Sequence, residues 1–144
     1  MPSLEFNAVI DADIDRAWSI VKRFGELAKW HPSIAKSEIE GGSPDGLIGV
    51  VRRVELPTGA ILRERLLSVD DVTRTLSYGF IESPLPVEGY VGTVRLTPIT
   101  GESKVFAQWF SRYELTDPSQ EEQMRTAFMD VYISGLKSLA EVSR

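Results

Sequence analysis

One glutamate falls on the apolar face of a predicted strand, where a carboxylate is costly to bury. Within residues 60–69, strand alternation places Leu62, Glu64 and Leu66 on the same face. A carboxylate removed from water must be paired or hydrogen-bonded. Two interpretations follow. Glu64 either reaches the rim and pairs with a surface arginine or lysine, or lines a cavity and receives a ligand hydroxyl, a water or a cationic partner.

The only histidine of the chain, His31, stands between Trp30 and Pro32 in the stretch FGELAKWHPSI. An imidazole changes charge near neutral pH and can donate or accept a hydrogen bond. It can therefore contact a carboxylate or carbonyl oxygen of a ligand, or transfer a proton. Equally, it can cap a short helix at the rim with its ring against Trp30. His31 and Glu64 are the two candidate catalytic residues.

Aromatic side chains share the predicted inner face of the later strands, together with a few hydroxyl groups. A mostly apolar lining with a few placed polar groups suits a small, hydrophobic, partly oxygenated ligand. The same rings can instead fill an ordinary core. The candidate ligand-binding residues are Trp30, His31, Leu62, Glu64, Tyr78, Phe80, Tyr90, Trp109, Ser111, Tyr113, Phe128 and Val131.

Periodicity predicts the elements that position these side chains within one α+β domain over residues 1–144. A strand at 3–11 precedes two short helical segments, IDRAWSIV after the N-cap Asp13 and ELAKW before Pro32. Strands follow at 34–40, 47–55, 60–69, 73–81, 89–98 and 103–115, separated by turn-forming residues. A long helix at 118–141 closes the chain, and its apolar stripe needs the sheet as a partner.

Composition excludes several classes of function. The chain has 16 basic and 21 acidic residues, a net charge of −5, and no basic cluster of the kind that neutralises nucleic-acid phosphates. It has no cysteine, which removes thiolate chemistry and zinc–cysteine sites and fits a cytoplasmic location. One histidine and scattered carboxylates do not predict a metal site, and no nucleotide-binding motif occurs. We therefore expect no cofactor.

The N-terminal stretch MPSLEFNAVIDADID has neither a basic segment nor a long apolar run, so neither a signal peptide nor a membrane span is expected. The sequence leaves the oligomeric state open, with a homodimer among the alternatives. The expected partner is a small hydrophobic or aromatic molecule.

The order of these elements, taken with three stretches of sequence, resembles the helix-grip fold of the START-like (SRPBCC) superfamily. The stretches are IDADIDRAWSIVKRFGELAKWHP, RERLLSVDDVTRTLSYGF and AFMDVYISGLKSLAE. The superfamily includes polyketide cyclase/dehydratase-like and birch-pollen-allergen-like proteins and, more distantly, plant abscisic acid receptors. The resemblance covers essentially the whole chain. It implies a curved seven-stranded antiparallel sheet around the C-terminal helix, with a ligand cavity between them.

The resemblance also implies roles for single residues. The ERL tripeptide that begins at Glu64 is similar to one that the receptors place against their ligand–water network, which favours the cavity for this carboxylate. Trp30 and His31 stand where the receptors have an aromatic residue followed by a ligand-contacting lysine. A histidine is a weaker fixed charge than a lysine, so an obligate carboxylate ligand is not predicted.

Two loops are placed to cover the mouth of such a cavity. LPTGA at 56–60 is similar to the receptors' gate loop, whereas ESPLPVEG at 82–89 lacks their latch motif and contains two prolines. A hormone receptor that closes and captures a phosphatase is therefore not expected. The loops either form a lid or are ordinary hairpins.

The expected function is binding of a small hydrophobic, partly oxygenated ligand between the sheet and the C-terminal helix, as in lipid-transport members of the superfamily. The alternative is a polyketide cyclase/dehydratase-like enzyme that uses the same cavity. In that enzyme His31 or Glu64 transfers a proton while tyrosine hydroxyls orient carbonyl groups.

Overall fold

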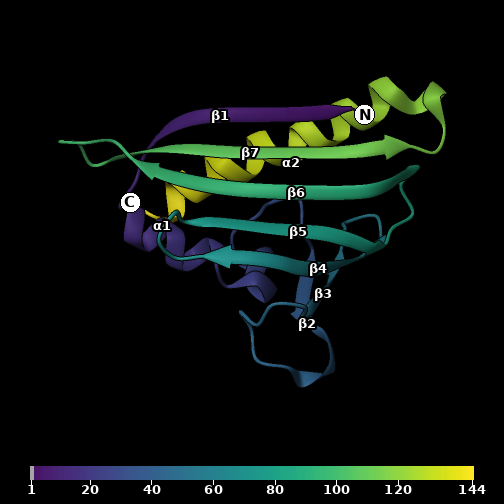
Figure 1. The fold of residues 1–144 in the computed structure, drawn as a ribbon, viewed down its shortest axis with the longest axis horizontal. Coiled ribbons are helices and arrows are strands. Elements are labelled where there is room, and N and C mark those ends of the chain that lie inside the picture. The colour runs from purple at the N-terminus through teal and green to yellow at the C-terminus, as the bar shows by residue number, and fades with distance from the viewer. Residues whose placement is uncertain (1) are drawn as a thin grey trace.

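Seven antiparallel strands form one sheet in the computed structural model, which describes residues 2–144 (Figure 1). The strands are β1 (Ser3–Asp11), β2 (Lys36–Ile39), β3 (Val51–Glu55), β4 (Ile61–Asp70), β5 (Thr75–Glu82), β6 (Val87–Pro98) and β7 (Lys104–Leu115). Their order across the sheet is β1-β7-β6-β5-β4-β3-β2, so the first strand pairs with the last. The predicted strands are confirmed. The second is shorter than expected because a turn and a bend precede it and a 3₁₀ helix begins at residue 40, and the third is shorter because turns take up part of residues 45–49.

Two α-helices and three short 3₁₀ helices complete the fold: α1 (Ile14–Val21), η1 (Phe24–Lys29), η2 (Glu40–Gly42), η3 (Pro118–Gln120) and α2 (Glu121–Val142). The Asp13 side chain accepts a hydrogen bond from the Arg16 backbone N–H at 3.0 Å and so caps α1, as predicted. Asp117 accepts from the Ser119 backbone N–H in the same way. The long C-terminal helix is confirmed, although its first turn is the separate 3₁₀ segment η3.

Helix α2 lies across one face of the sheet, and the sheet curls toward it (Figure 1). In this view β1, β7 and β6 run side by side, while β2 and β3 turn away from their direction. The face of α2 toward the sheet is buried along its length, at Met124, Phe128, Tyr132, Gly135, Leu136 and Leu139. These residues recur at helical spacing, so one stripe of the helix packs into the hollow of the sheet.

His31 joins the segment after η1 to α2. It is 1% exposed, and its Nε2 lies 2.9 Å from the backbone oxygen of Val131. Its Nδ1 accepts from the backbone N–H of Ser33 at 3.1 Å. These two bonds require the neutral imidazole with its proton on Nε2. His31 therefore holds one edge of the inner hollow through hydrogen bonds to the backbone.

A glycine in the middle of α2 permits this close approach. A Cβ atom on Gly135 would lie 2.6 Å from a ring carbon of Trp109 and 2.8 Å from Nε2 of His31. Both distances are shorter than any normal van der Waals contact, and both rings are buried. Position 135 therefore has to lack a side chain for the helix to meet the sheet here.

We predict that Gly135→Ala destabilises the protein by about 1–3 kcal/mol, the usual cost of overpacking a core. At an exposed helical position the same change would stabilise by about 1 kcal/mol, because alanine is the better helix former. Urea unfolding of the two proteins measures the difference. Lys137→Ala, an exposed change in the same helix, is the control. A more stable Gly135→Ala variant would contradict the close packing.

We also predict that His31 makes the protein less stable as the pH falls. Burial lowers the pKa of His31 below 6.5, and the positive charge of Arg52 lowers it further, whereas the hydrogen bond to Val131 partly offsets both. As the pH falls, His31 is therefore protonated more readily in the unfolded chain than in the folded protein. The contribution of His31 to the free energy of unfolding is complete above the pKa that it has in the unfolded chain, and it declines below that pKa.

The free energy of unfolding should thus decrease between about pH 7 and pH 5, and His31→Gln should flatten this slope. Urea unfolding across that range measures it. The glutamine amide can still donate to Val131 but does not titrate, so the slope is informative even when the variant is less stable. Equal slopes in the two proteins would contradict a buried neutral imidazole.

Candidate functional site

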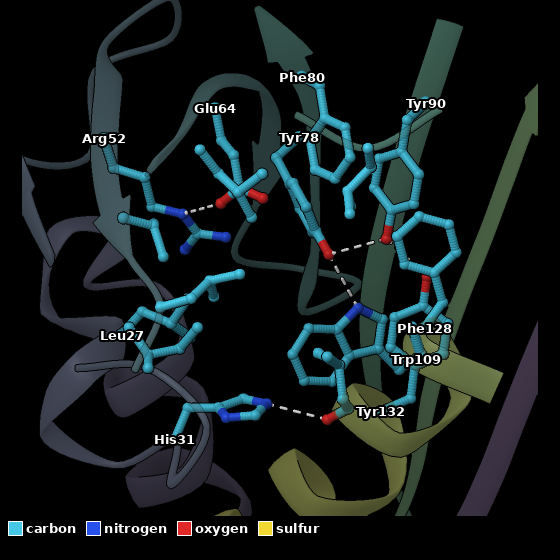
Figure 2. A pocket seen from close by; sticks show the side chains of 17 residues that line it. Leu27, His31, Arg52, Glu64, Tyr78, Phe80, Tyr90, Trp109, Phe128 and Tyr132 are labelled. Carbon is cyan, nitrogen blue, oxygen red and sulfur yellow. Dashed lines mark hydrogen bonds and ion pairs between the residues drawn. The ribbon is translucent and has the colours of Figure 1, made fainter. Parts of the chain in front are cut away.

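A cavity of about 130 Å³ lies between the sheet and α2 (Figure 2). Its lining comes from η1, the segment after it, five neighbouring strands, two loops and α2. Most of the lining is aliphatic or aromatic: Leu27, Ile34, Val54, Leu56, Leu62, Phe80, Leu85, Ala127, Phe128 and Val131. Polar or titratable groups are contributed by His31, Arg52, Glu64, Tyr78, Tyr90, Trp109 and Tyr132. The hollow is thus mainly apolar, as the strand parity predicts.

An ion pair between Arg52 and Glu64 occupies one end of the cavity (Figure 2). The two residues lie opposite each other on β3 and β4, with Nε of Arg52 2.7 Å from Oε1 of Glu64. Each residue is 5% exposed. A pair this deeply buried needs further bonds, because both charges have lost their hydration.

The protein holds the guanidinium of Arg52 from two further sides. Its Nη1 donates to the backbone oxygen of Phe24 at 3.0 Å. Its Cζ lies 3.9 Å from the centre of the Phe24 ring and 5.0 Å from that of Tyr78. Hydrogen bonds and cation–π contacts together fix a side chain that is otherwise flexible.

Two polar atoms of this pair are left open to the cavity. Within residues 2–144, every fully buried side-chain nitrogen or oxygen has a hydrogen-bond partner. Oε2 of Glu64 and Nη2 of Arg52 make no hydrogen bond to another described residue, so neither is fully enclosed by protein. Figure 2 shows the second carboxylate oxygen directed toward the interior of the pocket. The polar end of the cavity therefore offers one acceptor and one donor.

Away from the ion pair, the hydroxyl groups of the cavity form a linear chain of hydrogen bonds that runs from Trp109 to Ser111. Trp109 donates from Nε1 to the Tyr78 hydroxyl at 3.1 Å. The Tyr78 and Tyr90 hydroxyls lie 3.3 Å apart, and those of Tyr90 and Tyr132 lie 2.5 Å apart. Tyr132 donates to Ser111 at 2.5 Å. Each tyrosine proton is thus committed to the next oxygen in the chain.

Burial keeps these phenols protonated. It raises the pKa of Tyr78 to about 12, with a further contribution from the negative charge of Glu64. Burial also raises the pKa of Tyr90 and that of Tyr132. At neutral pH none of the three can act as a base, so they serve as fixed dipoles and as packing surface.

A glycine in β6 makes room for the centre of this chain. Gly92 lies directly opposite Tyr78, and a Cβ there would be 2.5 Å from the phenol ring and 2.6 Å from its oxygen. Any side chain at position 92 would therefore displace the phenol from this place. The position of the Tyr78 hydroxyl thus depends on the lack of a side chain at Gly92.

Most of the residues predicted to bind a ligand do line the cavity: His31, Leu62, Glu64, Tyr78, Phe80, Tyr90, Trp109, Phe128 and Val131. The other three are buried outside its lining. Trp30 packs against Trp109, and Ser111 accepts from Tyr132. Tyr113 lies beside the rings of Tyr90 and Phe128. Alternation identifies the face that a side chain takes, but not whether other rings cover it.

The two candidate catalytic residues differ in what they can still do. Glu64 lines the cavity and keeps one oxygen free for a ligand, and its partner is an arginine, but a buried one rather than a surface one. His31 also lines the cavity, yet both of its nitrogens are occupied by backbone groups. A proton-transfer role for either residue stays a prediction, and the geometry favours Glu64.

Sequence reasoning missed Arg52 and Tyr132. The signal for Arg52 was present, because Val50, Arg52 and Val54 alternate on the buried face. The short loop 56–60 then sets position 52 opposite position 64. Tyr132 follows Phe128 by four residues and so belongs to the same helical stripe. Both residues could have been found by comparing the inward-facing positions of neighbouring strands and of the C-terminal helix with one another.

Among residues 2–144, no three histidine, cysteine, aspartate or glutamate side chains gather where they could hold a metal ion. Over the same residues, no helix has the length and apolar character needed to cross a membrane.

Several known proteins are similar to this chain in sequence or in fold. Over 93% of this chain and 75% of the relative, the sequence is 27% identical to the abscisic acid receptor PYL10 of Arabidopsis thaliana. The protein XoxI from Bacillus cereus superposes with a TM-score of 0.87 at 25% identity, over 99% of this chain and 96% of that one.

Norcoclaurine synthase from Thalictrum flavum, solved with dopamine and hydroxybenzaldehyde, superposes with a TM-score of 0.78. The superposition covers 98% of this chain and 85% of the synthase. At 18% sequence identity it shows the shared fold alone. The family model described as polyketide cyclase/dehydrase and lipid transport matches residues 1–144. The resemblance to START-like (SRPBCC) proteins is thereby confirmed, and the chain belongs to the polyketide cyclase/dehydrase and lipid transport family.

Proposed function

We propose that this protein binds a small, hydrophobic, partly oxygenated molecule in the cavity between the sheet and α2. The observation that carries the proposal is an apolar hollow into which Oε2 of Glu64 and Nη2 of Arg52 are open. Placed polar atoms in an apolar lining orient a ligand, while the apolar surface supplies most of the affinity. A receptor for abscisic acid among the relatives supports a binding role.

The volume limits the size of the ligand. An apolar cavity of about 150 Å³ is enough to hold one benzene ring. The hollow here, at about 130 Å³, therefore suits a molecule built on a single ring. Leu56 and Leu85 bring the two loops at 56–60 and 82–89 to the lining. Movement of these loops would be needed for a larger ligand.

The alternative function is cyclase- or dehydratase-like chemistry in the same cavity. The observation in its favour is the free oxygen of Glu64, which is placed to accept a proton from a bound molecule. His31 and the tyrosines would contact the substrate through their ring surfaces but not exchange protons with it, since their polar atoms are engaged. Such an enzyme would depend on Glu64 alone for proton transfer.

We predict that Ala127→Trp abolishes binding without affecting the fold. Ala127 is an exposed residue of α2 that also lines the cavity, so a bulky ring there would block the hollow from its open side. Thr126→Trp is the matched control, since Thr126 is exposed, adjacent and outside the lining. Native mass spectrometry of freshly purified proteins, together with extraction and identification of any bound molecule, measures occupancy.

Occupancy of the wild type and of Thr126→Trp, but not of Ala127→Trp, is the expected result. Equal occupancy in all three would place the ligand elsewhere and contradict the proposal. Incubating the identified molecule with the wild type and with Glu64→Gln then separates the two functions. Conversion by the wild type alone identifies an enzyme, and unchanged ligand in both samples identifies a binding protein.

A further inference from the structure

We infer that the cavity selects a neutral ring compound carrying an adjacent hydrogen-bond donor and acceptor, such as an aromatic amide, over the matching anion or cation. This inference rests on the proposed binding function and specifies the chemical class of the ligand. It follows from which atoms of the Arg52–Glu64 pair are already used and which remain open.

The two open atoms lie at the same end of the cavity. Nη2 of Arg52 shares a carbon with Nε, and Oε2 of Glu64 shares a carbon with Oε1. Nε and Oε1 are themselves joined at 2.7 Å. A ligand group that reaches one open atom therefore lies beside the other. The remaining nitrogen of the guanidinium, Nη1, is held by the Phe24 carbonyl and fixes the direction of Nη2.

The rest of the lining offers no competing charged or unsatisfied group. Both nitrogens of His31 are bonded to backbone, and the Trp109 N–H donates to Tyr78. The tyrosine hydroxyl protons are committed within their own chain. The polar part of a ligand therefore has one place to bind, and its ring must lie against the apolar remainder.

The charges of Arg52 and Glu64 sum to zero, and this balance determines the chemical class of the ligand. A carboxylate could accept from Nη2, but its second oxygen would face Oε2 of Glu64. An amidinium could donate to Oε2, but its second nitrogen would face Nη2 of Arg52. Each would bring a net charge into a site that already balances its own, and burying such a charge is costly. A carboxamide accepts from Nη2 and donates to Oε2 without either conflict.

Three probes of nearly identical shape test this reasoning: benzamide, benzoate and benzamidinium. Toluene is the fourth probe, because it can occupy the apolar part without polar contacts. Chemical-shift perturbation of backbone amides, with ¹⁵N-labelled protein at pH 7, gives each dissociation constant. We expect wild-type protein to bind benzamide at least about tenfold more tightly than either ion, a ratio that corresponds to about 1.4 kcal/mol.

The variants should invert the preference. Glu64→Gln keeps the shape but leaves the positive charge of Arg52 unbalanced, so benzoate should become the tightest of the three. Arg52→Gln should favour benzamidinium for the converse reason. Where Arg52→Gln does not fold, Glu64→Gln carries the test by itself. Ala127→Trp, which blocks the hollow, should abolish every one of these effects, and a purely structural ion pair would not predict an inversion.

The outcomes separate the inference from the proposed function. Equal affinity of wild type for the three ring compounds, within about threefold, would overturn the inference, as would an unchanged order in Glu64→Gln. Toluene binding would in that case leave the proposed function standing. Failure of all four probes to bind the wild type would overturn both.

Discussion

The buried ion pair between Arg52 and Glu64 is the constraint on which the rest of the site depends. Two opposite charges out of water are tolerated only when geometry and additional hydrogen bonds compensate for lost hydration. The hairpin of β3 and β4 sets the two residues opposite each other, and η1 supplies the carbonyl of Phe24. Elements far apart in the sequence thus meet at one guanidinium. Removing either partner would leave the other charge buried and alone.

The cavity has two chemically different regions, and the ion pair occupies one of them. On the far side, Tyr78, Tyr90 and Tyr132 satisfy one another through a hydrogen-bond chain that ends at Ser111. The hydroxyl groups there are hydrogen-bonded to one another. A ligand on that side would therefore contact the faces and edges of the rings. On the near side, Glu64 and Arg52 still have free atoms. The family fold provides the hollow, and in our proposal these free atoms determine which ligand the chain selects.

Much of the fold and part of the site could be predicted from the sequence, because alternation and helical spacing are local signals. They placed Glu64 and the aromatic rows on the inner face and located the C-terminal helix. Alternation also puts Arg52 on one face with Val50 and Val54, but an arginine there is understandable only once the pairing of β3 with β4 sets it opposite Glu64. These local signals could not show that the backbone around Val131 and Ser33 occupies both nitrogens of His31. Burial of Trp30 and Tyr113 behind other rings likewise depends on packing between elements.

A crystal structure determined under xenon pressure would show whether the hollow between the sheet and α2 is open. Xenon binds apolar cavities of this size, and its anomalous signal locates it without ambiguity. We expect a xenon atom between β4 and α2, near Leu62 and Phe128, with Glu64 hydrogen-bonded to Arg52 beside it. A solidly packed interior without xenon, or a Glu64 side chain directed into bulk solvent, would contradict this expectation.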